Sequence, residues 1–308
     1  MKTNNRRRRL ADRHYLVYYL MLLPTIVFFV VFNYIPMTGI YYAFTKFSFT
    51  GGLFGSQFVG LDNFKYLFKS GILFRITRNT ILYNIAFILI GNFAQIVLAV
   101  LISRVMGKLF KRITQSMLLL PYFVSFVILR VLVYNLFNYE IGLVNSTFAS
   151  MGIAPYDFYN KTALWPFIII FFYLWKSVGY GSVIYLASIT GIDPELYESA
   201  SIDGAGVFKQ ILYITLPLLK ATFITLFLFS LGSILKGQFE LFYQLVGSNG
   251  NLFTVTDIID TFVFRSLTTD FDIGRSSAAG VYQSVFGFIL IMTVNTIIKR
   301  KNPEYALF

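Results

Sequence analysis

Cysteine is absent from this 308-residue sequence, which excludes disulfides and thiol chemistry and removes one route to a metal site. Charge is also scarce, because 13% of the residues are charged where a soluble domain has about 25%. Apolar residues make up 56% of the chain, and the mean hydropathy is +0.67. So little charge could not cover a protein surface in water, and the composition therefore indicates a membrane protein.

Histidine is nearly absent too, with His14 as the single example. Zinc hydrolases and Ser–His enzymes need histidine near other ligands or a nucleophile, and a carboxylate protease needs two facing aspartates inside the membrane. None of the long apolar stretches contains an aspartate, and the sequence lacks the G-x-x-x-x-G-K-[ST] phosphate-binding loop of ATPases. We therefore expect no catalytic site, no metal and no ATPase site in this chain, and we rank an intramembrane enzyme as a weak alternative.

The net charge of +12 is distributed in a way that argues against nucleic-acid binding. The basic residues stand in short runs beside apolar stretches, as at residues 6–9 and 299–301, which is the pattern of the positive-inside rule. This pattern predicts that both termini lie in the cytoplasm, with residues 1–14 as a basic N-terminal segment. An even number of crossings agrees with that placement.

Six apolar stretches are each near the roughly 20 residues that a helix needs to cross a bilayer. The first is longer than the apolar part of a typical signal peptide and lacks a small-residue cleavage site after it, so we expect an uncleaved helix. The predicted fold class is an all-α membrane protein with six transmembrane helices, forming one domain over residues 1–308. The predicted spans are residues 15–37, 76–103, 113–137, 165–188, 217–239 and 278–298.

Residues 189–216 fit neither a span nor a simple turn, and the predicted topology places them in the cytoplasm. Asp193 suits the N-cap of a helix, and Pro194 suits its first position, where the missing N–H would be unpaired anyway. Glu195 adds negative charge where the helix dipole favours it, and Gly204 can end the helix in a left-handed conformation. A helix this short is not stable alone in water, so it should dock on a partner or rest on the protein's own membrane end.

This loop contains the pattern Glu198-Ser199-Ala200, Gly204 and, after nine further residues, Ile214-Thr215-Leu216-Pro217. The pattern resembles the signature loop of ABC importer permeases, which has the form E-A-A-x-x-x-G, nine residues, then I-x-L-P. The one departure is Ser199 where the family has alanine, and serine is small enough to preserve close packing. Other stretches are similar to the narrower group of LplB-like permeases of the carbohydrate-uptake family, at residues 58–64, 120–125, 142–145, 175–180, 185–187 and 304–308.

The resemblance implies a type I importer permease fold in which the signature helix is a coupling helix. In the family, this helix docks on a separate ABC ATPase subunit that binds ATP and Mg, so the chain itself needs no cofactor. Glu198, Ala200 and Gly204 would carry the contact, while Asp203 would add a polar contact or simply cap the helix. The residues that would fix how the loop re-enters the membrane are Ile214, Leu216 and Pro217, although Ile214 and Leu216 could equally be plain buried apolar residues.

The same resemblance implies further partners and a place in the bacterial plasma membrane. A six-span chain makes half of a pathway, so a second permease is expected, as a distinct YtcP-like chain. An extracellular lipid-anchored or periplasmic binding protein would deliver an oligosaccharide or other glycan to the outer face. The predicted external segments at residues 41–74, 138–161 and 240–277 are the candidates to meet it, or are plain connections between helices.

Polar side chains inside apolar spans are costly and often line a pathway. They also serve as hydrogen-bond partners between helices, and for each residue this second role is the more common one. The candidates for contact with substrate are Asn84, Asn92, Gln95, Tyr134, Asn135, Gln238 and Glu240. An ion-coupled transporter or a channel is the alternative class, but such proteins usually show intramembrane acids or paired broken helices, and neither is evident in the sequence.

Overall fold

The computed structural model describes residues 17–301, and the predicted basic N-terminal segment, His14 and residues 302–308 lie outside the described residues. Apart from one two-stranded sheet, the regular elements of the described chain are all helices. Its long elements are the first helix (Val17–Phe44), α4 (Ile72–Ser103), α5 (Lys108–Phe123), α6 (Phe126–Phe137), α8 (Trp165–Thr190), α11 (Leu216–Leu231) and α15 (Ile273–Lys301). Its short elements are η1 (Val30–Tyr34) and η2 (Ile35–Phe44) within the first helix, β1 (Thr45–Lys46), α2 (Gly52–Gly55), β2 (Gln57–Phe58), α3 (Asp62–Lys69), α7 (Leu143–Ser150), α9 (Pro194–Ile202), α10 (Val207–Gln210), η3 (Ile211–Thr215), α12 (Phe239–Val246), η4 (Gly250–Leu252), α13 (Phe253–Thr256) and α14 (Ile259–Thr268).

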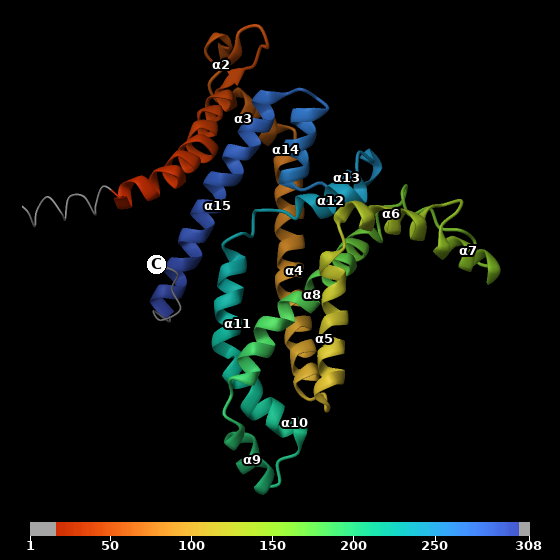
Figure 1. The fold of residues 1–308 in the computed structure, drawn as a ribbon. Coiled ribbons are helices and arrows are strands. Elements are labelled where there is room, and N and C mark those ends of the chain that lie inside the picture. The colour runs from red at the N-terminus through yellow and green to blue at the C-terminus, as the bar shows by residue number, and fades with distance from the viewer. Residues whose placement is uncertain (1–16, 302–308) are drawn as a thin grey trace, which may run out of the picture.

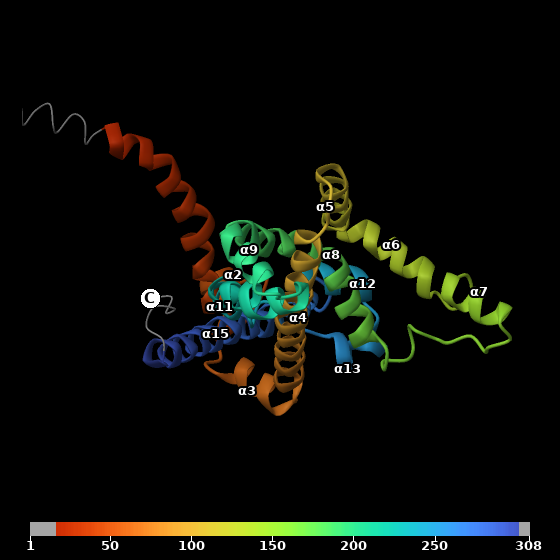
Figure 2. The same ribbon diagram turned by 90° about the horizontal axis from the view of Figure 1, so that it is seen from below.

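The long helices α4, α5, α8 and α11 form a bundle with two distinct ends (Figure 1). Helices α9 and α10 lie at one end, which we call the α9 end, and α2 and α3 lie at the other, which we call the α3 end. The first helix and the α6–α7 pair project from opposite sides of this bundle (Figure 2). The most apolar 18-residue window of the first helix contains no buried residue, so this part of the helix is left to lipid or to a partner, whereas Ala43 near its end is fully buried.

Five of the described helices are long and apolar enough to cross a membrane, and a bent pair, α5 with α6, would make a sixth. Four predicted spans coincide with the first helix, α4, α8 and α15. The predicted fifth span, residues 217–239, has wrong bounds, because the helix starts ten residues earlier at Val207 and ends at Leu231. Pro217 cannot donate a helical hydrogen bond, yet the helix continues through it, because the preceding π-helical turn η3 is closed by Leu216 N–H donating to Ile211 O.

The predicted third span, residues 113–137, is wrong as a continuous helix, because α5 and α6 meet at 89°. Pro121 in the last turn of α5 lacks an N–H, and the backbone becomes extended at Val124 and Ser125. The Ser125 hydroxyl then accepts from the N–H of Ile128 and starts α6. The Lys176 ammonium on α8 donates to the carbonyls of Tyr122 and Val124, which satisfies backbone oxygens that the break leaves free.

Helix α4 contributes to all three clusters of buried apolar side chains. Tyr83 and Phe87 pack with α6, α8 and α12, Ile76 packs with α14 and α15, and Ala99 packs with α8 and α11. Helix α8 crosses α5 closely at Gly179, where a Cβ atom would lie 1.8 Å from the carbonyl oxygen of Leu118. Glycine at this position therefore sets the distance between the two helices.

Residues 240–277, predicted as an external segment, fold back into the bundle near its α3 end. Leu241 on α12 is 1% exposed and Ile258 is 0% exposed, so the segment fills a core and is more than a surface connection. Asp257, also fully buried, is held by Arg265, whose two terminal nitrogens lie 3.0 and 2.8 Å from its carboxylate oxygens. Arg75 of α4 approaches the same carboxylate at 4.0 Å, which ties α4 to α14 by charge.

The buried Asp257 carboxylate gives a stability test. We expect Asp257→Asn to lower the free energy of unfolding by about 3 kcal/mol, because it leaves the Arg265 guanidinium without its counter-charge. Thermal unfolding of the detergent-purified protein measures this loss. The matched control is Asp62→Asn, because Asp62 pairs with Lys65 at 2.9 Å in an exposed site and such pairs contribute little. Equal losses in the two variants would contradict the assignment.

Candidate functional site

Helix α9 has the end structures that the sequence predicts. The Asp193 carboxylate accepts the N–H of Glu195 at 3.0 Å, and Pro194 takes the first helical position. At the other end Gly204 adopts φ +77°, and the N–H of Ala205 donates to Ala200 O at 2.8 Å. This is the hydrogen-bond pattern of a left-handed glycine cap, so the helix closes both of its ends with its own residues.

The α9 loop exposes most of the residues that the resemblance singles out. Glu198, Ser199, Asp203 and Gly204 are exposed, and Ala200 is half-buried. At the re-entry, Ile214 is half-buried whereas Leu216 and Pro217 are exposed, so the reading of Leu216 as a buried residue is wrong. Sequence reasoning missed two large apolar side chains on the same loop, Ile202 and Phe208, which are 87% and 89% exposed.

Four of the predicted pathway residues line one cavity of about 300 Å³ between α4, α8 and α11. These are Asn84, Asn92, Gln95 and Gln238. Tyr173 and Tyr180 of α8 line the same cavity and were missed, because the chain is so rich in aromatic residues that composition does not single them out. The cavity combines amides, serine hydroxyls and tyrosine rings, and its described lining contains no charged residue.

Two of these amides also hold the bundle together. The Asn92 oxygen accepts the Tyr185 hydroxyl at 2.6 Å, and its nitrogen donates to Ile88 O at 2.7 Å. Asn84 donates to Thr80 O and to Lys236 O. Asn92 and Asn84 therefore both stabilise the helix bundle and line the cavity. Gln95 lies against Gly181, where a Cβ atom would meet the Gln95 amide carbon at 2.3 Å.

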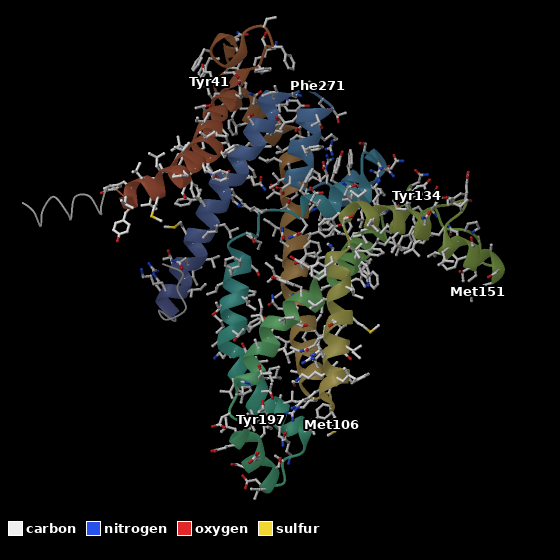
Figure 3. The ribbon with its side chains drawn as sticks, viewed as in Figure 1. Tyr41, Met106, Tyr134, Met151, Tyr197 and Phe271 are labelled. Atoms are coloured by element: carbon white, nitrogen blue, oxygen red, sulfur yellow. The ribbon has the colours of Figure 1, made fainter. Side chains whose placement is uncertain are left out.

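The remaining pathway candidates lie outside this cavity. Tyr134 packs near Tyr159, with ring centroids 6.0 Å apart, toward the α3 end (Figure 3). Asn135 lines a separate apolar pocket on α6, and Glu240 is exposed in the first turn of α12. The α5–α6 break separates Tyr134 and Asn135 from the cavity, because it turns α6 away from the bundle axis. A contact of these three residues with substrate stays a prediction.

An unwound segment, residues 232–238, separates α11 from α12 and was not predicted. Three helices satisfy its backbone: Lys236 O accepts from Asn84 at 3.3 Å, Leu235 O accepts from Gln283 at 2.7 Å, and Gly237 N–H donates to Asp260 at 2.7 Å. Burial raises the pKa of the Asp260 carboxyl, and its hydrogen bonds from Gly237 and Gln283 oppose that rise. The glycine pair Gly232 and Gly237 was the signal in the sequence that could have located this break.

This segment lies between two cavities. Ser233 lines both the 300 Å³ cavity and a second one of about 500 Å³, whose polar lining includes Lys236, Asp260 and Gln283. Of the two features typical of ion-coupled transporters, intramembrane acids and broken helices, the structure shows broken helices, at the α5–α6 junction and at residues 232–238, which the sequence did not reveal. Asp260 lies outside the long apolar helices, and its partners are the backbone and an amide.

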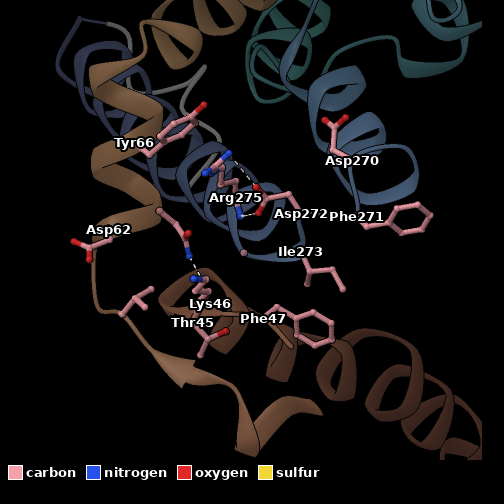
Figure 4. Close-up of a pocket in the computed structure, with 13 residues that line it drawn as sticks. Thr45, Lys46, Phe47, Asp62, Tyr66, Asp270, Phe271, Asp272, Ile273 and Arg275 are labelled. Carbon is pink, nitrogen blue, oxygen red and sulfur yellow. Dashed lines mark hydrogen bonds and ion pairs between the residues drawn. The ribbon is translucent and has the colours of Figure 1, made fainter. Parts of the chain in front are cut away.

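A third pocket opens at the α3 end, between the β1 region, α3 and the start of α15 (Figure 4). The Arg275 guanidinium stacks 3.7 Å from the centre of the Tyr66 ring and pairs with Asp272 at 3.2 Å. Phe271 adopts φ +52°, the one positive φ among the non-glycine residues that the structure describes. The charged residues of its lining are the acids Asp62, Asp270 and Asp272 and the bases Lys46 and Arg275, so the pocket has no strong charge of one sign.

The profile of binding-protein-dependent transport system inner membrane components matches residues 88–301, a stretch that contains the α9 loop and most of the cavity. The chain belongs to this family. It is therefore a multi-pass protein of the inner membrane and a transport component, and the resemblance to ABC importer permeases is confirmed. Membership alone leaves the number of crossings and the side of each terminus as predictions.

Relatives extend the match to nearly the full chain. Protein LplB of Bacillus subtilis is 34% identical over 93% of this chain and 89% of its own, and the polygalacturonan/rhamnogalacturonan transport system permease protein YteP of the same organism is 33% identical over 96% and 91%. The chain also superposes on a chain of a bacterial alginate ABC transporter, whose crystal structure was solved in complex with an alginate pentasaccharide-bound periplasmic protein. That match has a TM-score of 0.82 and 32% identity over 95% of this chain and 96% of that one.

The close approach at Gly237 gives a test of the unwound segment. A Cβ atom there would lie 2.3 Å from Ile258 Cδ1 and 2.7 Å from Asp260 Oδ2. We expect Gly237→Ala to cost about 1–3 kcal/mol of unfolding free energy by overpacking, measured by thermal unfolding in detergent. In Gly280→Ala, the control, the new methyl group meets no atom within 4 Å, and alanine should be neutral or slightly stabilising. A Gly237→Ala protein as stable as the control would refute the packing argument.

Proposed function

We propose that this chain is the transmembrane permease subunit of an ATP-driven importer for carbohydrate, and that the cargo is an oligosaccharide or complex glycan. Two of its relatives support a glycan, because one is a polygalacturonan/rhamnogalacturonan transport system permease and the other belongs to an ABC transporter that imports alginate. The cavity supports it as well, because amides and hydroxyls can bond sugar hydroxyls while Tyr173 and Tyr180 offer ring faces. Asn84, Asn92, Gln95 and Gln238 are the proposed substrate contacts.

The α9 loop is the observation that carries the coupling part of the proposal. It extends beyond the bundle and presents Glu198 and Ile202 outward on α9, a helix that closes its own ends, and Phe208 outward on the neighbouring α10. Exposed large apolar side chains beside a charged one suit a protein partner better than water. That partner is a separate ATPase, which would bind ATP and Mg, and Ala200 and Gly204 would allow its close approach.

The proposed topology follows from this assignment. The α9 end faces the cytoplasm, six crossings include the bent α5–α6 pair, and both termini are cytoplasmic. A second, distinct permease completes the pathway beside the cavity. A lipid-anchored or periplasmic sugar-binding protein meets the α3 end, where the predicted external segments lie.

Coupling is tested by what co-purifies with the tagged chain. We expect an ABC ATPase with the wild type and its loss with Glu198→Arg or Gly204→Arg, because either change puts a long cation where the ATPase would pack. Gly204→Arg also forces a side chain into a positive-φ position. Glu140→Arg, an exposed exchange on the connection between α6 and α7, should keep the ATPase. If folded wild-type protein never brings an ATPase, the importer assignment fails.

Substrate contact is tested by kinetics of the reconstituted complex. Oligosaccharides of alginate, galacturonan and a neutral glucan are first compared for stimulation of ATP hydrolysis, and the best one is used in uptake assays. We expect Gln95→Leu to raise KM roughly tenfold with little change in kcat, as loss of one ground-state hydrogen bond would. Gln115→Leu on α5, outside the cavity lining, is the control. An unchanged KM in Gln95→Leu would remove Gln95 from the pathway.

A further inference from the structure

The end of α4 is attached to the α9 loop through one arginine. Arg104, the C-cap residue of α4, donates from Nη1 to the side-chain oxygen of Gln210 at 3.1 Å. Its guanidinium carbon also lies 5.0 Å from the centre of the Tyr197 ring on α9. A planar guanidinium can stack on a ring and donate at its edge together, whereas a lysine ammonium offers only a point charge. One side chain thus joins α4 to both arms of the loop.

The groups that Arg104 contacts are themselves fixed. Gln210 is 7% exposed, and its amide nitrogen donates to Ser201 Oγ at 2.8 Å and to Ala205 O at 3.3 Å. The Tyr197 hydroxyl lies 3.0 Å from Thr215 Oγ1, which is on the helix that leads into α11. We call the set Arg104, Tyr197, Ser201, Gln210 and Thr215 the Arg104 clamp. Each hydrogen bond orients the next, so a shift of α9 relative to α4 would break several at once.

Helix α4 connects the clamp to the cavity without interruption. It runs from Ile72 to Ser103 as one α-helix, and Gln95 stands nine residues before Arg104, about 14 Å along the axis at 1.5 Å per residue. Asn92 and Asn84 also line the cavity, and they lie farther from Arg104 toward the N-terminus of the same helix. An unbroken helix packed in three apolar clusters moves as a rod, so displacement of its end displaces its cavity face.

We propose that Arg104 is a positioning residue that transmits movement of the α9 loop to α4 and so to the cavity wall. The inference rests on the proposed function, in which an ATPase moves α9. It adds a second route beside the covalent one through α10, η3 and α11. Arg104 contacts neither substrate nor nucleotide, and its effect is on the coupling between them.

The test uses the cysteine-free sequence, in which a single introduced Gln95→Cys reports on the cavity. The full complex with its ATPase is labelled with a maleimide, with and without a non-hydrolysable ATP analogue. The parent variant should change its labelling rate when the analogue binds. Adding Arg104→Ala should reduce that change roughly fivefold while the ATPase still co-purifies. Arg104→Lys should restore part of it, because the cation remains and the planar fork is lost.

Two further variants separate coupling from folding. Lys108→Ala, in the first turn of α5 close to Arg104 in the chain, is the matched loss of a basic residue and should leave the change intact. Gln210→Leu removes the same hydrogen bond from the other side, together with the bonds to Ser201 and Ala205, so the double variant with Arg104→Ala should be no worse than Gln210→Leu alone. The inference is overturned if the Arg104→Ala complex keeps the full effect of the nucleotide analogue on labelling. If that complex does not assemble, the Gln210→Leu complex is judged by the same criterion. The inference is also overturned if the analogue has no effect on labelling of the parent variant. Failure of the ATPase to bind the parent would instead refute the proposed function.

Discussion

Backbone groups that leave a helix inside a bilayer find no water, so another part of the protein must bond them. Two interruptions of this bundle meet that requirement with side chains from distant helices. Lys176 of α8 serves the carbonyls between α5 and α6, and Asn84, Asp260 and Gln283 serve residues 232–238. The polar residues of the membrane domain therefore determine where helices can end, and the cavity lies beside one such end, at residues 232–238.

Local signals explain what could be predicted from the sequence. Long uninterrupted apolar runs gave α4, α8 and α15, and Asp193 with Gly204 gave α9 and both of its ends, because caps depend on a few adjacent residues. Asn92 and Gln95 stood out as polar residues in apolar runs. Both line one cavity together with Gln238.

The features that the sequence did not predict share a different cause, because they depend on contacts between residues that are far apart in the chain. Hydropathy continues through Ser125 and through residues 232–238, so both breaks were read as helix. What permits them is the ammonium of Lys176, 51 residues after Ser125, and the carboxylate of Asp260, which a window average cannot relate to them. Residues 240–277 were read as external because their polar residues obscured a core that includes Leu241 and Ile258.

The caps of α9 have a mechanical consequence. Because Asp193 and Gly204 close the helix from within the loop, and Arg104, Gln210 and Thr215 hold it from behind, its shape does not depend on the groove that would receive it. Helix α9 can therefore transmit force in both directions when its partner moves. In a transport cycle such a loop would travel and return as one rigid piece, and no turnover would have to wait for it to refold.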